Sequence, residues 1–184
     1  HTSHMDLTPG AKVPGRGHFQ LERQLSPSGS SEVWLARHSK TGEQRVYKFS
    51  PDGSRLSSLK REATLFRVLR EGLGERDDSV RIIDWNFETA PFFLECEFGG
   101  QSLSDWAQTG HALDNMTQNE RLAFFVQICD TVSAAHSVGV LHKDLKPGNV
   151  LVADEGGSWR TRLTDFGSSR LLEPGRLDEL GITS

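Results

Sequence analysis

The apolar pattern of this 184-residue chain changes at Gly99-Gly100, and this change constrains the fold more than any other feature. Before the two glycines, five short segments have the apolar pattern of β-strands, and one longer segment has helical spacing. After them the pattern becomes mainly helical, with one small hairpin of apolar strands. The sequence therefore predicts an α+β protein with two lobes, one built on a five-stranded sheet and one mainly on helices.

The predicted elements are bounded by turn residues such as Gly, Pro, Ser and Asp. Strands are expected at residues 19–23, 32–36, 45–49, 80–85, 91–98, 149–153 and 160–165, and helices at 57–70, 103–107 and from 117 to about 139. The first helix is expected to turn Leu59, Ala63, Phe66 and Leu69 inward. In the last helix, Thr117 and Glu120 form a capping box. Its predicted inward face consists of Leu122, Phe125, Val126, Cys129 and Val132.

Composition narrows the class of protein. The formal net charge of −4 argues against broad nucleic-acid binding, which needs a basic surface. No apolar run approaches the ~20 residues of a membrane span. Two cysteines are too few for a disulfide framework, so a reducing, cytoplasmic location is expected. Residues 1–16 are interpreted as a tag remnant and leader, 17–98 as the first lobe and 99–184 as part of the second.

Two motifs in the last third of the chain carry the chemistry. One is His142-Lys143-Asp144-Leu145-Lys146-Pro147-Gly148-Asn149, and the other is Asp165-Phe166-Gly167 at the end of an apolar strand. In this order, on either side of a strand hairpin, they resemble the catalytic loop and metal-binding triplet of eukaryotic-like (Hanks-type) serine/threonine protein kinases. The run at residues 32–37 is similar to bacterial members. The resemblance implies a two-lobe kinase fold with an antiparallel sheet in the N-lobe.

The resemblance also implies a role for each polar residue of these motifs. Asp144 would orient the substrate hydroxyl or accept its proton, and Lys146 would contact the transferred phosphoryl group. Asn149 and Asp165 would hold Mg²⁺, which prefers hard oxygen ligands beside the phosphates. Phosphoryl transfer needs positioning and neutralisation of charge rather than a covalent intermediate, so carboxylates, an amide and a lysine suit the reaction.

Lys48 ends the third predicted strand, in the place of the family's phosphate-binding lysine. The resemblance implies that it contacts the α- and β-phosphates of ATP. Its expected partner is Glu62 on the first helix, and Glu71 at the end of that helix is the alternative. Cys96 is expected at the gatekeeper position. The residues expected to contact ATP are Lys48, Leu25, Ser28, Gly29, Val33, Val46, Glu97, Phe98 and Leu151.

Three features depart from the family pattern. The stretch at residues 25–33 has serine at all three positions where the family has glycine, which predicts weaker ATP binding. Lys143 replaces a common arginine that grips a phosphorylated loop through two parallel hydrogen bonds. Only 17 residues follow Gly167, so the kinase domain is expected to be truncated within its activation loop. The chain is then expected to expose apolar surface, to be inactive alone and to be followed by further domains.

The sequence thus predicts ATP- and Mg²⁺-dependent phosphorylation of serine or threonine hydroxyls in proteins. Two alternatives stay open: a pseudokinase that serves as an ATP-binding scaffold, and a small-molecule phosphotransferase of the aminoglycoside type. The serine-substituted loop favours the pseudokinase. Lys146 and the complete Asp165-Phe166-Gly167 motif favour a protein substrate.

Overall fold

The computed structural model describes residues 7–26, 32–74, 79–141, 145–156, 158–164 and 170–171. The chain divides into two compact units. The first comprises His1–Ala63 and Arg81–Phe98, and the second comprises Thr64–Val80 and Gly99–Ser184. The division falls inside helix α1 (Leu56–Leu73), which therefore supplies residues to both units.

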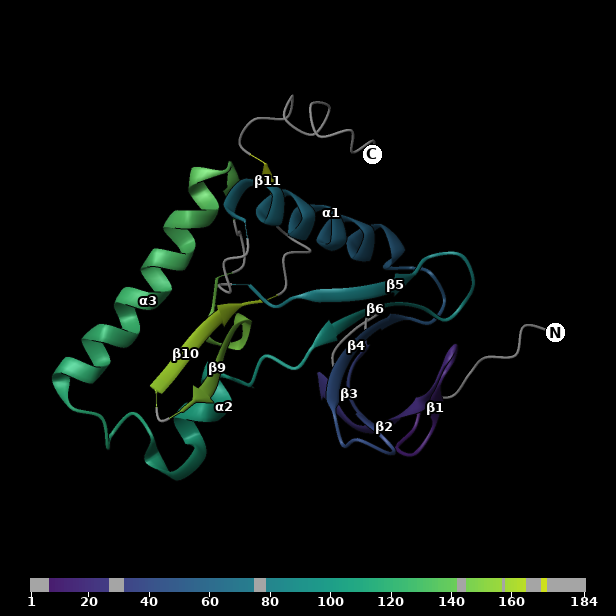
Figure 1. Ribbon diagram of the computed structural model, residues 1–184, viewed down its shortest axis with the longest axis horizontal. Coiled ribbons are helices and arrows are strands. Elements are labelled where there is room, and N and C mark those ends of the chain that lie inside the picture. Colours follow the sequence, from purple (N-terminus) through teal and green to yellow (C-terminus); the bar gives the residue numbers. More distant parts are fainter. Residues whose placement is uncertain are drawn as a thin grey trace. The chain divides into compact units, whose positions relative to one another are not determined.

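The first unit is built on a strongly curled antiparallel sheet (Figure 1). Its strands are β1 (Lys12–Val13), β2 (Arg16–Ser26), β3 (Glu32–His38), β4 (Gln44–Ser50), β5 (Ile82–Asn86) and β6 (Phe92–Glu97). The order in the sheet is β1-β2-β3-β4-β6-β5. The predicted five strands are all present, but the sheet has a sixth. β1 is only two residues long, too short for an apolar alternation to reveal it.

The core of the first unit lies on one face of this sheet. Its buried members come from five strands: Val13, Phe19, Leu21, Trp34, Ala36, Tyr47, Phe49 and Phe93. Val13 is only 1% exposed, and Leu7 and Ala11 pack against the cluster. Residues 7–13, interpreted from sequence as leader, therefore contribute apolar surface to the core.

The second unit combines helices with two small antiparallel sheets. The helices are α2 (Leu103–Gln108), the short η1 (Thr109–His111), α3 (Gln118–Ser137) and the short η2 (Pro147–Asn149). One sheet has the order β10-β9-β7, and a two-stranded ladder joins β11 to β8. The strands are β7 (Gln101–Ser102), β8 (Val140–Leu141), β9 (Val150–Glu155), β10 (Ser158–Leu163) and β11 (Arg170–Leu171). The described part of this unit, which also includes the end of α1, contains strands as well as helices, and it does not clearly show the predicted mainly helical character.

Helix α1 was predicted at the correct place, but its buried stripe is shifted from the predicted one. Leu59 and Leu69 are buried as predicted, whereas Ala63 and Phe66 are only half-buried. The remaining buried apolar positions are Leu65 and Val68, which join the core of the second unit with Ala135, Val138, Val140, Val150 and Leu163.

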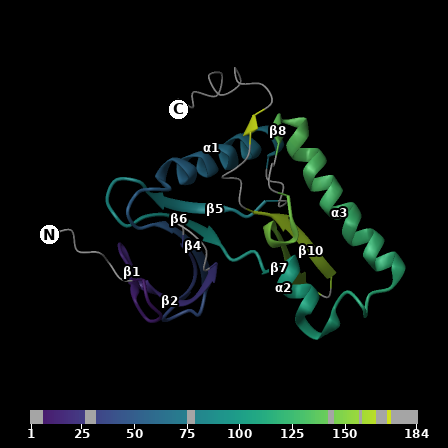
Figure 2. The same ribbon diagram turned by 180° about the vertical axis from the view of Figure 1, so that it is seen from behind.

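Helix α3 begins at the predicted cap. The hydroxyl of Thr117 accepts the backbone N–H of Glu120 at 3.1 Å, which satisfies a donor of the first turn. Along the helix, Gln127 hydrogen-bonds β10: its amide donates to the carbonyl of Trp159 and accepts the N–H of Thr161. Figure 1 and Figure 2 both show α3 beside β10. No helix in the described part of the chain is both long enough and apolar enough to cross a membrane.

The predicted inward face of α3 was wrong. Leu122, Phe125 and Val126 are 60%, 62% and 56% exposed, Cys129 is exposed and Val132 is half-buried. The buried face instead carries Phe124, Thr131, Ala134 and Ala135. Apolar residues occur on more than one side of this helix, so spacing alone did not identify the packed side. The expected exposure of apolar surface is confirmed at Leu122, Phe125 and Val126.

Candidate active site

Lys48 lies near the end of β4, in the middle of the curled sheet. It pairs with Val33 of β3 on one side and with Leu94 of β6 on the other. Because side chains alternate across a strand, Lys48 shares a face of the sheet with Val46. Val33 and Val46 are both half-buried. A central strand with neighbours on both sides holds the lysine backbone rigidly.

The ammonium of Lys48 forms an ion pair with the carboxylate of Glu62 on α1, as predicted. Both side chains are largely buried, with 12% and 9% of their surfaces exposed. Glu71, the alternative partner, instead pairs with Arg67 at 3.2 Å on the exposed side of α1. Charged side chains with so little solvent contact are rare in proteins unless they are paired or serve a function. The pair presents a fixed cationic group on the same face as Val46.

Cys96 lies opposite Val46 on β6, near Lys48 and Glu62. Its side chain is buried, and burial raises the pKa of the thiol to about 12, with Lys48 lowering it less than burial raises it. The thiol therefore stays protonated and acts as a small apolar group in the sheet.

We expect Cys96 and Cys129 to differ sharply in reactivity. Cys129 is exposed on α3, whereas Cys96 is buried and protonated. At pH 8 the Cys96 thiol should react with Ellman's reagent about a thousandfold more slowly than an unperturbed thiol. The native chain should show one fast thiol, Cys129→Ser should show none, and a denaturant should expose both cysteines. Two fast thiols in the native chain would contradict this assignment.

The same pKa shift has a consequence for stability. The folded thiol ionises only near 12, whereas the ordinary value is 9.0. The stability that Cys96 contributes is therefore fully present below pH 9 and is lost as the pH rises from 9 toward 12.

Glu97 ends β6 and Phe98 follows it, and both belong to the residues predicted to contact ATP. The backbone N–H of Glu97 donates to the carbonyl of Arg81 at 3.0 Å, and its carboxylate accepts the N–H of Arg81 at 3.0 Å. Phe98 is half-buried. Leu25 is the first of the predicted ATP-contacting residues in the sequence, and it is 38% exposed near the end of β2. Ser28 and Gly29 lie outside the described residues.

The second unit carries the other predicted site residues that the structure describes. Asn149 is the last residue of η2 and is only 6% exposed. Lys146, the residue before η2, is exposed. The carbonyl of Asn149 accepts the N–H of Thr164 at 3.0 Å, at the open end of the β9–β10 hairpin. Thr164 immediately precedes Asp165 in the sequence. Asp144 and Asp165 themselves lie outside the described residues.

Leu151 lies on β9 of the same unit and is half-buried. A Cβ atom on Gly99 would come within 2.9 Å of its side chain and 3.0 Å of that of Val80. The absence of a side chain at residue 99 thus allows the chain that follows β6 to approach Leu151 closely.

The chemistry of these residues fits ATP and Mg²⁺. The ammonium of Lys48, held by Glu62, is suited to bind phosphate oxygens. The amide oxygen of Asn149 is a hard ligand of the kind magnesium prefers, and the hairpin brings its backbone to the residue before Asp165. Within the described ranges, no three His, Cys, Asp or Glu side chains gather as a metal site.

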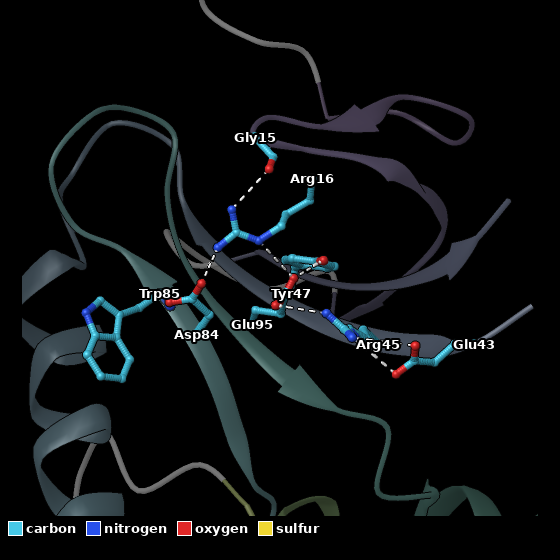
Figure 3. Close-up of polar contacts among 8 residues, drawn as sticks. All are labelled: Gly15, Arg16, Glu43, Arg45, Tyr47, Asp84, Trp85 and Glu95. Carbon is cyan, nitrogen blue, oxygen red and sulfur yellow. Dashed lines mark hydrogen bonds and ion pairs between the residues drawn. The ribbon is translucent and has the colours of Figure 1, made fainter. Parts of the chain in front are cut away.

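Sequence reasoning missed a second set of polar side chains, centred on Glu95 (Figure 3). The Glu95 carboxylate is almost completely buried and contacts Tyr47, Arg45 and Arg16. The signal was present in the sequence, because Glu95 is a charged residue inside the apolar strand of residues 92–97. A buried carboxylate in a strand interior requires partners, and that requirement predicts a polar network.

Comparison with known proteins identifies the family of the chain. Residues 19–184 match the protein kinase domain family, and the chain belongs to that family. It is 30% identical to the serine/threonine-protein kinase pkn2 of Myxococcus xanthus over 86% of its length. It is 29% identical to CBL-interacting protein kinase 21 of Oryza sativa over 97%, and 26% identical to the serine/threonine-protein kinase PknA of Mycobacterium tuberculosis over 96%.

These relatives are much longer proteins. The aligned region covers 19% of pkn2, 32% of CBL-interacting protein kinase 21 and 41% of PknA. All three carry the name of a protein kinase, and two are bacterial.

Proposed function

We propose that this chain binds ATP with Mg²⁺ and belongs to a protein that phosphorylates serine or threonine hydroxyls of other proteins. The observation that carries the proposal is the buried Lys48–Glu62 ion pair in a chain of the protein kinase family. ATP supplies the phosphoryl group, and magnesium neutralises charge on the phosphates. A cytoplasmic, reducing location is part of the proposal and is supported by the free state of Cys96 and Cys129.

Each residue has a defined task in this proposal. Lys48 binds the α- and β-phosphates, and Glu62 fixes the position of the lysine. Asn149 and Asp165 hold the metal ion. Asp144 orients the substrate hydroxyl and takes its proton, while Lys146 contacts the phosphoryl group as charge develops on it. Protein substrates are favoured over small molecules because the named relatives are protein kinases.

The test is thermal unfolding of the chain with and without Mg²⁺ and ATP. Ligand at about 100 times its Kd stabilises the native state by about 2.7 kcal/mol. Asp165→Asn should abolish the Mg²⁺-dependent shift, whereas Asp144→Asn should retain it and lose phosphoryl transfer. Transfer at the parent rate in both variants would refute these roles.

A pseudokinase is the second candidate function, because residues 25–33 have serine at the three positions where the family has a glycine that allows close approach to phosphate. Binding of ATP that depends on Mg²⁺, without transfer by a protein that includes downstream sequence, would favour this candidate. Absence of any ATP-dependent shift would favour a scaffold that does not bind nucleotide.

A further inference from the structure

Glu95 is a buried charge that the proposed phosphoryl transfer does not use. It is 1% exposed, in the middle of β6. Its carboxylate accepts hydrogen bonds from the hydroxyl of Tyr47 and from the guanidinium of Arg45 at 3.0 Å, and Arg16 lies 3.4 Å away. Removing a carboxylate from water is costly, and a well-packed apolar side chain is often at least as stabilising as a buried ion pair. Stability alone is therefore a weak explanation for this network.

The network holds β4 from the face opposite Lys48. Tyr47 lies directly across from Glu95 in the β4–β6 ladder, next to the Lys48–Leu94 pair. Arg45 and Tyr47 alternate with Val46 and Lys48, so the two pairs project to opposite sides of the strand. Burial raises the pKa of the Tyr47 hydroxyl above its ordinary range, and the bond to Glu95 raises it further. Tyr47 therefore keeps its proton and remains a donor.

Arg16 extends the network across the sheet. It lies at the start of β2, and β3 and β4 separate that strand from β6 in the sheet order. Its guanidinium nevertheless contacts Glu95 on β6 and Asp84 on β5, and it lies 5.7 Å from the centre of the Phe93 ring. Figure 3 shows Arg16 reaching toward both carboxylates. A single side chain thus ties β2 to β6 and β5, which lie beyond β3 and β4 in the sheet order.

We propose that Glu95, with Arg16, Arg45 and Tyr47, is a positioning residue for Lys48. The network fixes β4 against β6 and β2. It thereby determines the position from which the Lys48 ammonium binds phosphate. The inference rests on the proposed function, because it assigns the network to ATP affinity. Charge-assisted hydrogen bonds are directional, so they resist the sliding of one strand past another more than apolar packing does.

The experiment compares Glu95→Gln with two controls in the full chain. Glu22→Gln removes one member of an exposed ion pair with Arg37 on the same sheet. Val13→Ala makes a cavity in the core of the same unit and replaces none of the four side chains of the network. The measurements are ATP affinity in Mg²⁺ at a temperature where every variant is folded, the melting temperature, and amide exchange of β4 without nucleotide.

We expect Glu95→Gln to weaken ATP binding by about five- to tenfold and to speed amide exchange at Lys48. Glu22→Gln should change neither. Val13→Ala should lower the melting temperature and leave ATP affinity unchanged. If Glu95→Gln does not fold, Tyr47→Phe replaces it in the experiment, because this variant removes one hydroxyl and keeps the ring packing. We expect Tyr47→Phe to weaken ATP binding by a smaller factor.

The inference is overturned if Glu95→Gln binds ATP as the parent does, or loses no more affinity than Val13→Ala at an equal fall in melting temperature. A parent chain that does not bind ATP refutes the proposed function instead. In that case amide exchange decides the inference: unchanged exchange at Lys48 in Glu95→Gln, or in Tyr47→Phe, overturns it.

Discussion

Replacing Gly100 by alanine is expected to destabilise the second unit by about 3 to 5 kcal/mol. Gly100 has a φ of +110°, a region that side chains strongly disfavour. A Cβ atom there would also lie 2.1 Å from the carbonyl oxygen of Val152. That oxygen belongs to the backbone of β9, where β7 pairs with it, so it cannot move aside as a flexible side chain would. The backbone must shift, and the short β7–β9 ladder must open.

The measurement is thermal unfolding together with amide exchange of β9. Gly110→Ala is the matched control, because Gly110 has a φ of +61° and a Cβ atom there would meet nothing within 4 Å. It should cost only about 1 kcal/mol, from backbone conformation alone. Equal effects of the two substitutions would show that the contact with Val152 does not constrain the chain.

Replacing Lys48 by methionine is expected to weaken Mg²⁺-dependent ATP binding by about 10- to 100-fold. Methionine keeps the length of the side chain and removes the charge that phosphate oxygens need. The substitution also leaves Glu62 largely buried without its cation, and an unpaired carboxylate repels the phosphates. Isothermal titration with ATP in the presence of Mg²⁺ measures the change directly.

Two substitutions on α1 separate this role from general charge effects. Glu62→Gln should also weaken ATP binding, because Lys48 then loses the carboxylate that holds it. Glu71→Gln removes the same charge from the same helix, but Glu71 pairs with Arg67 on the exposed side of α1 rather than with Lys48. It should leave ATP affinity unchanged. A loss of affinity in Glu71→Gln equal to that in Glu62→Gln would contradict the assignment of Glu62.

Local patterns predicted much of the fold and part of the site. Short apolar runs bounded by turn residues located the five longer strands of the first unit, because such runs and turns are recognised within a few residues of sequence. The Thr117 cap was predicted because a capping box depends on residues three apart in sequence. Glu62 was preferred to Glu71 as the partner of Lys48 because Glu71 lies at the end of the helix. The ion pair between Lys48 and Glu62 confirms that choice. The roles of all the site residues in ATP binding and phosphoryl transfer remain predictions, and Asp144 and Asp165 also lie outside the described residues.

Other features depended on neighbours that are distant in sequence. The network around Glu95 joins residues 16, 45, 47 and 95, and no local pattern links them. The packed face of α3 was predicted incorrectly because the helix is apolar on more than one side. Its contact with β10 through Gln127 selects the side with Phe124, Thr131 and Ala134.

The sequence by itself determined the order of the longer strands and helices and the family, because periodicity, caps and short motifs act over a few residues. The Lys48–Glu62 pair was implied by the family resemblance, with Glu71 as the alternative, and the structure selects Glu62. Only the tertiary structure decided that β1 completes the first sheet, that Gly100 must lack a side chain, and that Arg16 reaches Glu95. Each of these depends on how the chain curls back on itself. Burial and the pairing of buried charges belong to the packed molecule rather than to any single segment.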